Sequence, residues 1–405
     1  MAAALLALCA CDPAADEIKL ITATLNLKAD LAAGVSLPDS YSVKLTDETG
    51  AVAFDQTVNA SETTLSIPGL KPGIYSISVV GDAAANGKAY SFIGNLNGVT
   101  ITEDGAAIEV ALTVSEATAL LIKEMFYALG ANLNPGDNYR DDNFYEIYNN
   151  STIDQVLDGI CIADCAPTNA SAAIYSWELG NEDYVYALTI WQIPGDGTQY
   201  VLKPGESAII AAMAVDHTKL AGNSVDLSKA DFETWIPTQD MYADNPNVPN
   251  MKLLFGSFGE GRERWNTCAM GPAMVIFKPQ AAIDNSTWVS PIDKTDKCKE
   301  IPVEWVIDAV EAVQTDKDVQ YKRLPISLDA GATHVSSIEQ ELFPGYVMVV
   351  SNNNGNSVSR KIKSTEDGRN IYQDTNNSTE DFVYNETSMV RRDNAGVPSW
   401  SPAAK

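Results

Sequence analysis

The sequence has very few histidines, and this limits the chemistry available to the protein. Only two of its 405 residues are histidines, His217 and His334. The nucleophile-elbow, Walker, dinucleotide-binding and zincin motifs are absent as well. Because histidine supplies most general bases and many metal ligands, an enzyme built on this chain would have to rely on carboxylates.

Basic residues are also scarce. The chain has 27 Lys and Arg residues against 54 Asp and Glu residues, which gives a formal charge of −27. A surface of this sign repels phosphate backbones and anionic headgroups, so nucleic acid is excluded as a partner. The acidic excess is explained most simply by solubility, although it also suits cationic partners. No cofactor is predicted.

Long apolar runs are missing, and no stretch approaches the roughly 18–20 residues that a membrane-spanning helix needs. A short apolar segment does occupy residues 2–10, and it ends on Cys11 with the acidic residues Asp12, Asp16 and Glu17 following. The segment resembles the lipobox of bacterial lipoproteins, in which the cysteine becomes the acylated first residue. The resemblance implies attachment to a membrane through lipid at Cys11. The run lacks the basic start of a signal peptide, so either translation starts further upstream or the run is an ordinary apolar terminus.

Four cysteines follow Cys11 in the chain: Cys161, Cys165, Cys268 and Cys298. An envelope location permits disulfides. If residues 161–165 are extended, their first and last Cα atoms lie roughly 13 Å apart, too far for a bond. Cys268 and Cys298 lie in polar, turn-rich segments and are the preferred pair. The Cys-x-x-x-Cys spacing is not that of a zinc ribbon, so no metal site is predicted.

Residues 18–117 are predicted to form a small all-β module. Apolar and polar residues alternate in short runs, with turn residues such as Pro-Gly between them. The motif Gly-Leu-x-Pro-Gly-x-Tyr at residues 69–75 resembles Ig-like modules of the carboxypeptidase-regulatory type. The resemblance implies a stalk or spacer with no chemistry of its own.

Residues 118–405 are predicted to form a second β-sandwich. The apolar strands at 120–127 and 144–162 resemble the opening of a lamin-tail domain, which is an Ig-like sandwich. The segments Ser-x-x-Arg at 357–360 and Asp-Thr-Asn-Asn-Ser-x-x-Asp-Phe at 374–382 resemble its close. Because the two signatures lie some 200 residues apart, we expect one domain with insertions at about 221–250 and 256–302.

The whole chain is similar to a family of surface lipoproteins of the Bacteroides type, which have about this length and no assigned activity. The shared features are the acidic segment after the lipid cysteine, the Ig-like module and the lamin-tail-like domain. The resemblance implies a lipid-anchored protein of the outer membrane that is exposed at the cell surface.

Tryptophans in the predicted insertions are the candidate binding residues: Trp235, Trp265 and Trp288. Exposed rings stack on sugars or form protein interfaces, whereas the alternative for each is a place in the core. Carboxylates, whose oxygens could bind calcium, cluster at 137–146 and 367–381. Neither cluster has the ligand spacing of an EF-hand loop.

The sequence therefore predicts an all-β protein of two Ig-like sandwich modules. Its expected function is that of a non-catalytic binding or accessory subunit, beside an outer-membrane transporter or in adhesion, with a protein or glycan partner. The alternative is an extracellular hydrolase that uses carboxylates or a metal in the insertions.

Overall fold

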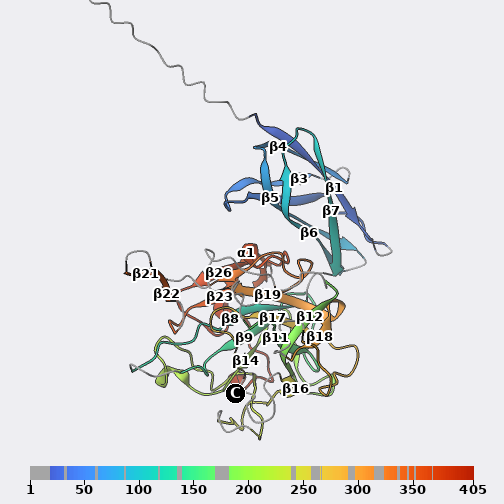
Figure 1. The fold of residues 1–405 in the computed structure, drawn as a ribbon. Helices are drawn as coiled ribbons and strands as arrows, with labels where there is room; N and C mark the ends of the chain where they lie inside the picture. The colour runs from blue at the N-terminus through green and yellow to red at the C-terminus, as the bar shows by residue number, and fades with distance from the viewer. Residues whose placement is uncertain are drawn as a thin grey trace, which may run out of the picture.

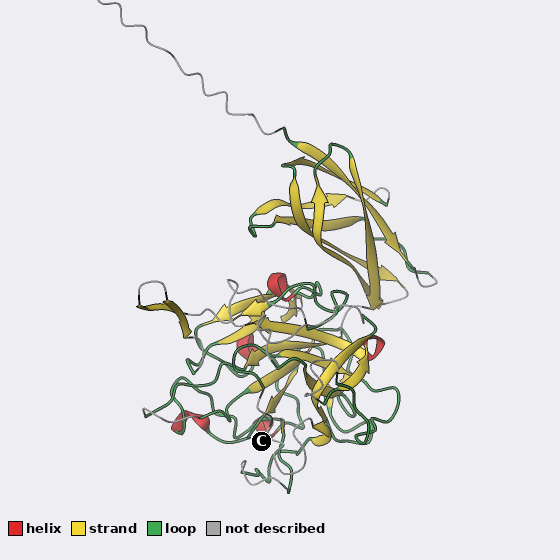
Figure 2. Cartoon of the chain, in the orientation of Figure 1, coloured by secondary structure: helices red, strands yellow, loops and turns green. Residues whose placement is uncertain are grey.

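A computed structural model describes the chain from residue 19 to residue 405, and it is built almost entirely of β-strands (Figure 2). The all-β prediction is confirmed. Short segments within that span lie outside the described residues: 32–33, 60–62, 86–87, 117–118, 135–138, 169–181, 239–242, 257–264, 266, 291–296, 314–322, 335–337, 344–345, 351–352 and 367. Cys11 precedes residue 19, so the predicted lipid site is also outside them.

The first module, residues 19–116, is one seven-stranded sheet in the order β3-β2-β5-β6-β7-β1-β4. Neighbouring strands are antiparallel except for the parallel pair of β1 and β7. The edge strands β3 and β4 contact each other, so the sheet curls around a core (Figure 1). The strands are β1 (Ile21–Ala29), β2 (Ser40–Asp47), β3 (Val52–Asn59), β4 (Thr64–Leu70), β5 (Gly73–Ala85), β6 (Lys88–Ile101) and β7 (Ala106–Glu116).

Alternation along the strands decides which side chains enter this core. In β2, Tyr41, Val43 and Leu45 are almost fully buried, whereas the residues between them face outward. Successive side chains of a strand point to opposite faces, so a strand with this pattern has one apolar face and one polar face.

The second module, residues 119–405, contains two facing sheets. One has the order β15-β14-β9-β8-β23-β26, and the other has the order β16-β12-β11-β17-β19-β20, with β18 also paired to β12. The first sheet consists of β8 (Leu120–Phe126), β9 (Phe144–Asn149), β14 (Ser207–Ala211), β15 (Phe232–Glu233), β23 (Ser357–Arg360) and β26 (Phe382–Asn385). The second consists of β11 (Cys161–Cys165), β12 (Tyr184–Gln192), β16 (Lys252–Gly256), β17 (Ala273–Phe277), β18 (Lys299–Pro302), β19 (Val306–Val313) and β20 (Thr333–His334).

One apolar core lies between these two sheets. Ile122 and Ile147 come from the first sheet, and Ile162, Trp191 and Met274 come from the second. Further buried clusters cover the outer face of each sheet, so these strands are nearly continuous apolar runs. The core and the two outer clusters together bury apolar surface in three layers, which stabilises the module.

The remaining elements are short. They are the two-stranded pairs β10 (Gln155–Val156) with β13 (Val201–Leu202), β21 (Ile338–Phe343) with β22 (Tyr346–Val350) and β24 (Ile362–Glu366) with β25 (Arg369–Tyr372), and the helices η1 (His217–Lys219), η2 (Val303–Trp305), α1 (Ser378–Asp381), η3 (Arg392–Asn394) and η4 (Pro402–Ala404). Among the described residues, no helix has the length and apolar character needed to cross a membrane.

Residues 256–302, which the sequence assigns to an insertion, supply two strands of the second sheet. β17 lies between β11 and β19, and β18 pairs with β12. A continuous apolar run as short as the five residues of β17 has no alternation to identify it as a central strand.

Candidate functional site

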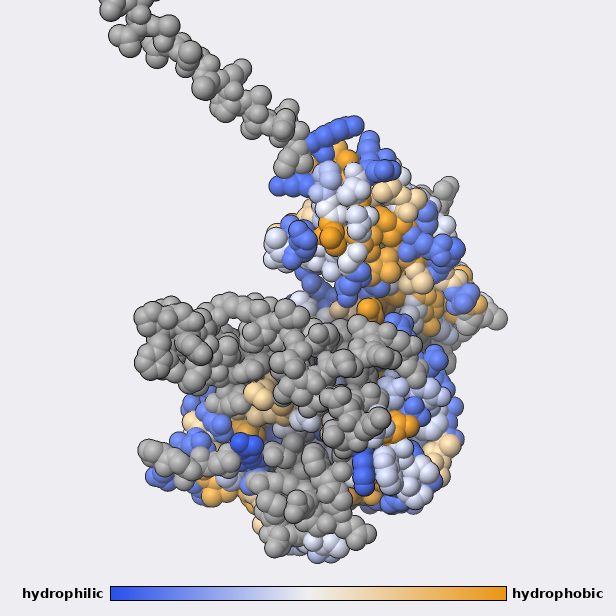
Figure 3. Space-filling view, viewed as in Figure 1, coloured by the Kyte–Doolittle hydropathy of each residue, from blue (hydrophilic) through white to orange (hydrophobic). Residues whose placement is uncertain are grey.

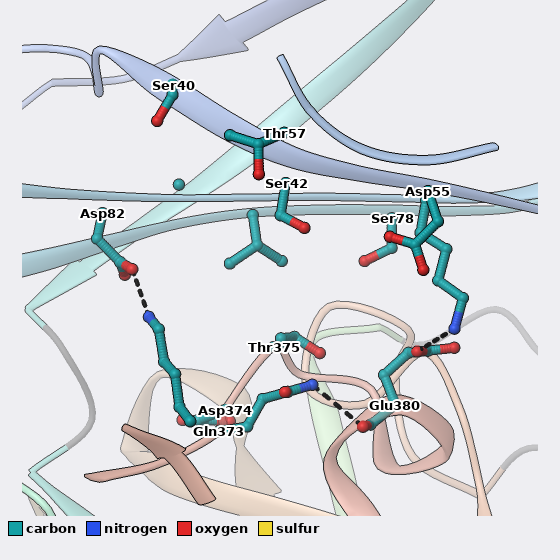
Figure 4. A pocket seen from close by; sticks show the side chains of 14 residues that line it. Ser40, Ser42, Asp55, Thr57, Ser78, Asp82, Gln373, Asp374, Thr375 and Glu380 are labelled. Carbon is teal, nitrogen blue, oxygen red and sulfur yellow. Dashed lines mark hydrogen bonds and ion pairs between the residues drawn. The ribbon is translucent and has the colours of Figure 1, made fainter. Parts of the chain in front are cut away.

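A polar cleft between the two modules is the strongest candidate site. It has a volume of about 520 Å³, and it lies between the outward face of β2, β3 and β5 and the loop and helix at residues 373–380 (Figure 4). Its volume is within the range of small-ligand sites. The lining residues are Ser40, Ser42, Lys44, Asp55, Thr57, Ser78, Val80, Gly81, Asp82, Lys363, Gln373, Asp374, Thr375 and Glu380.

The upper wall of the cleft follows directly from strand alternation. Ser42 of β2 lies opposite Thr57 of β3 and opposite Val80 of β5. Two residues further along, Lys44 lies opposite Asp55. Apart from the lysine, every side chain on this wall is short, so the sheet leaves open space where a larger residue would fill it.

Ion pairs between the modules lie on either side of the cleft. Lys44 of the first module pairs with Glu380 of the second, and Lys363 of the second pairs with Asp82 of the first (Figure 4). The first pair is mostly buried, whereas both side chains of the second are about half exposed. Exposed pairs of this kind contribute little stability, roughly 0–1 kcal/mol each, but they fix which groups face each other.

The lower wall is held by a buried arginine. Arg360 at the end of β23 donates to Asp308 Oδ1 at 2.6 Å, to Asp374 Oδ1 at 3.2 Å and to Asp381 Oδ2 at 3.4 Å. Asp381 also accepts two hydrogen bonds from Thr375, each of 2.8 Å. The loop that faces the cleft is therefore positioned by several charged hydrogen bonds.

The carboxylates around Arg360 have raised pKa values. Burial raises the pKa of Asp308 to about 7 and that of Asp381 to about 6, although the nearby guanidinium lowers both. Asp374 adds a third negative charge that raises them further. One arginine facing three carboxylates leaves an excess of negative charge, which favours uptake of a proton.

First-module side chains also form hydrogen bonds with the second module that involve no ionic pairing. The Asn95 amide donates to the Thr375 carbonyl at 3.1 Å, and the Asn97 amide donates to the Ala330 carbonyl at 3.2 Å. These bonds, together with the two ion pairs, join the modules around an open polar space.

His217, one of the two histidines of the chain, has a structural role. The His217 ring is fully buried, and its nitrogens lie 2.5 Å from the Tyr139 hydroxyl and 2.8 Å from the Met213 carbonyl. Burial lowers the pKa of His217. Asp216 caps the short helix η1 instead of orienting the ring. Among the described residues, no three His, Cys, Asp or Glu side chains are grouped as a metal site.

The three candidate tryptophans have different environments. Trp265 is 1% exposed and belongs to the core between the sheets, so the prediction that it is a binding residue is wrong. Its ring packs against Tyr145 with centroids 4.9 Å apart. Trp235 is half-buried beside Met213. Trp288 is 50% exposed, with the Lys297 ammonium 4.4 Å from its ring centroid, and remains a candidate.

The predicted disulfide is not formed in the structure, where Cys268 and Cys298 carry unbridged thiols. Cys298 is buried against Tyr186 and Leu188 at the edge of the second sheet. Cys268 instead begins the turn before β17, where the Gly271 amide donates to its carbonyl. The preference for this pair rested on turn-rich composition, which does not determine where the two turns lie in the fold.

A buried aspartate away from the cleft gives a testable pH effect. Burial raises the pKa of Asp164 to about 6, although hydrogen bonds from its own backbone and from Thr189 lower it. An aspartate in an unfolded chain has a pKa of about 3.9, so the folded state holds the proton of Asp164 more tightly than the unfolded state does. Protonated Asp164 therefore favours the fold at low pH, and this contribution is lost as the pH rises through about 6.

We expect the free energy of unfolding to fall by about 2 kcal/mol more in the wild type than in Asp164→Asn between about pH 4 and pH 7. Urea denaturation at several pH values measures this difference. Asparagine has nearly the same shape but no charge, so it is the matched variant. Equal pH slopes for the two proteins would show that Asp164 does not titrate in this range.

A second hollow lies on the first module, near the ends of β1 and β7. Its lining is mostly apolar and includes Leu27, Leu31, Leu37, Leu112 and Val114. Leu31 is 43% exposed, and Figure 3 shows apolar side chains of this module at the surface among polar ones. Such a lining has fewer groups to orient a ligand than the polar cleft, so the cleft is the stronger candidate.

Residues 203–389 match a family model described as a protein of unknown function (DUF4876). The chain is similar to the crystal structure of a DUF4876 family protein from Bacteroides thetaiotaomicron VPI-5482, with 29% sequence identity and a TM-score of 0.62. That similarity covers 95% of this chain and 100% of the other. It supports the expected relation to a Bacteroides family of unknown function.

A weaker match is the fimbrial anchor protein Mfa2 from Porphyromonas gingivalis, with 13% identity and a TM-score of 0.19. It covers 36% of this chain and 60% of that one, and a score this low carries no argument. The comparison with curated proteins gives no significant match. The Ig-like and lamin-tail-like types of the modules therefore stay predictions.

Proposed function

We propose that the chain is a non-catalytic, lipid-anchored protein of the outer membrane that acts as a binding or accessory subunit at the cell surface. The arrangement of the modules carries this proposal. β1 enters the first module at the end far from the second module (Figure 1). A membrane anchor at Cys11 would thus hold the first module as a spacer and present the second module, with the cleft, away from the membrane.

The placement of the buried charges supports a binding role over a catalytic one. Glu146 is paired with Lys123 at 3.1 Å, and Glu311 is paired with Arg323 at 3.0 Å, all four side chains being buried. A carboxylate paired in this way stabilises the fold or fixes a local arrangement, and it is not available to transfer protons to a substrate.

Replacing Cys11 by serine tests the anchor. We expect Cys11→Ser to abolish incorporation of labelled fatty acid and to move the protein from the membrane fraction to the soluble fraction, because serine has no thiol to acylate. Cys9→Ser is the matched control and should leave both readouts unchanged. Persistent labelling of Cys11→Ser would overturn the anchor.

The accessory role has a separate test. Cross-linking of the anchored protein on intact cells, followed by affinity capture and mass spectrometry, should recover the same envelope protein or glycan repeatedly. Capture of no partner, together with turnover of a glycan or peptide panel by the purified protein, would favour a hydrolase instead.

A further inference from the structure

We propose that the cleft between the modules binds a neutral, polyhydroxylated ligand, namely a segment of an uncharged glycan. The inference rests on the proposed binding role and names the ligand class for it. It uses three properties of the cleft: its open wall of short side chains, its mixture of hydrogen-bonding groups, and its prearranged lower wall.

The open wall gives the ligand room. Ser40, Ser42, Thr57 and Ser78 place hydroxyl groups on the outward face of the sheet, and Ser42 and Thr57 are exposed although the second module faces them. The space of about 520 Å³ thus arises where the two modules meet without filling it with side chains. A tightly packed joint between modules would instead use larger residues at these positions.

The mixture of groups matches hydroxyl chemistry. A sugar hydroxyl both donates and accepts, and the cleft offers carboxylate acceptors, ammonium donors and hydroxyls that do either. Val80 is the main apolar contact, so the lining does not suit an aliphatic or aromatic ligand.

The charges of the cleft select against ionic ligands. Two lysines face four carboxylates, those of Asp55, Asp82, Asp374 and Glu380, which leaves the lining with a negative formal charge. This charge disfavours phosphate, sulfate and uronate groups. A cationic ligand would have to compete with Lys44 and Lys363, which already pair with Glu380 and Asp82. An uncharged ligand is the one that neither effect opposes.

The lower wall is prearranged for binding. Thr375 is held by Asp381, which is in turn held by Arg360, and Asn95 fixes the Thr375 carbonyl from the other module. Groups that are already ordered lose little conformational entropy when a ligand binds. Because most of the side chains that line the cleft are polar, we still expect a weak single-site affinity.

Glycan-array binding tests the proposal. The full chain with Cys11→Ser and a C-terminal biotin is displayed on streptavidin, whose several sites raise the avidity of a weak interaction. We expect it to bind a subset of neutral glycans and to bind sulfated, phosphorylated and sialylated glycans less. Binding to no neutral glycan, or a preference for anionic glycans or for polyamines, would overturn the proposal.

Two sets of variants locate the binding. Ser42→Trp fills the cleft and should weaken the binding of the selected glycans by roughly tenfold or more, whereas Ser66→Trp, exposed on β4 outside the cleft, should leave it unchanged. If Ser42→Trp lowers the melting temperature strongly, a second test combines the exposed substitutions Asp55→Asn and Thr57→Val. At nearly constant shape they replace a carboxylate acceptor by an amide and remove a hydroxyl group, and they should also weaken binding. Wild-type binding by both sets would overturn the assignment to the cleft. Since the anchor is absent from all these proteins, their result is independent of the membrane-fraction test of Cys11.

Discussion

Replacing Arg360 by leucine is expected to lower the free energy of unfolding of the second module by about 3–5 kcal/mol. The guanidinium is fully buried and bonds Asp308, Asp374 and Asp381 as well as the carbonyls of Ile122 and Gln373. Without it, three carboxylates would face one another in the interior, and burying unpaired charge is costly. We expect a smaller loss near pH 5, where the raised pKa values of Asp308 and Asp381 allow both to be protonated.

Tryptophan fluorescence in a urea titration measures this effect in the second module alone, because all seven tryptophans follow residue 117. Far-UV circular dichroism reports on both modules, so the first module can be followed in the same samples. Lys363→Met is the matched control: it removes an exposed cation beside the cleft and should change stability by less than about 1 kcal/mol. A loss below that value for Arg360→Leu would mean that the arginine does not hold the closing segment together.

Replacing Trp265 by alanine is expected to destabilise the second module by about 3–5 kcal/mol, the usual cost of truncating a large aromatic side chain in a core. Its ring is 1% exposed and packs against Tyr145 in the core between the two sheets. Trp288→Ala removes an equally large ring that is 50% exposed, and it should cost no more than about 1 kcal/mol, mainly through the contact with Lys297.

The two variants distinguish a core tryptophan from a surface tryptophan within one segment, residues 256–302, which is predicted from the sequence to be an insertion. Chemical denaturation followed by far-UV circular dichroism is the suitable measurement, since both variants alter the fluorescence itself. Comparable losses of unfolding free energy for Trp265→Ala and Trp288→Ala would contradict the difference in burial and the assignment of Trp265 to the core.

Local patterns predicted the all-β class because they reflect local physics. The alternation of Tyr41, Val43 and Leu45 predicts a strand with one buried face, and the structure places all three in the core. The closing segment was also informative: the Arg and Asp residues of its two motifs, Arg360, Asp374 and Asp381, meet in one ion network.

Properties that depend on distant segments could not be predicted. Trp235, Trp265 and Trp288 look alike in the sequence, because the burial of each depends on which sheet covers its loop. Turn-rich composition favours a pair of Cys268 with Cys298, although the two lie in different packing environments. The residues of β17 look like part of an insertion, since a five-residue apolar run has no pattern specific to a strand between two others.

The candidate cleft had one signal in the sequence, which is the short polar residues that alternate with the core residues of β2. This alternation predicts which side chains of the strand point outward, but it does not predict which segment of the chain lies opposite them. Lys44 meets Glu380 across 336 positions of the chain, and Asp82 meets Lys363 across 281. By itself, the sequence determined the β-class, the acidic charge and the expectation of a lipid anchor at Cys11. The tertiary structure alone decided that a polar face of the first module lies opposite the arginine-held loop of the second, because that contact depends on how the two modules pack and not on any local pattern.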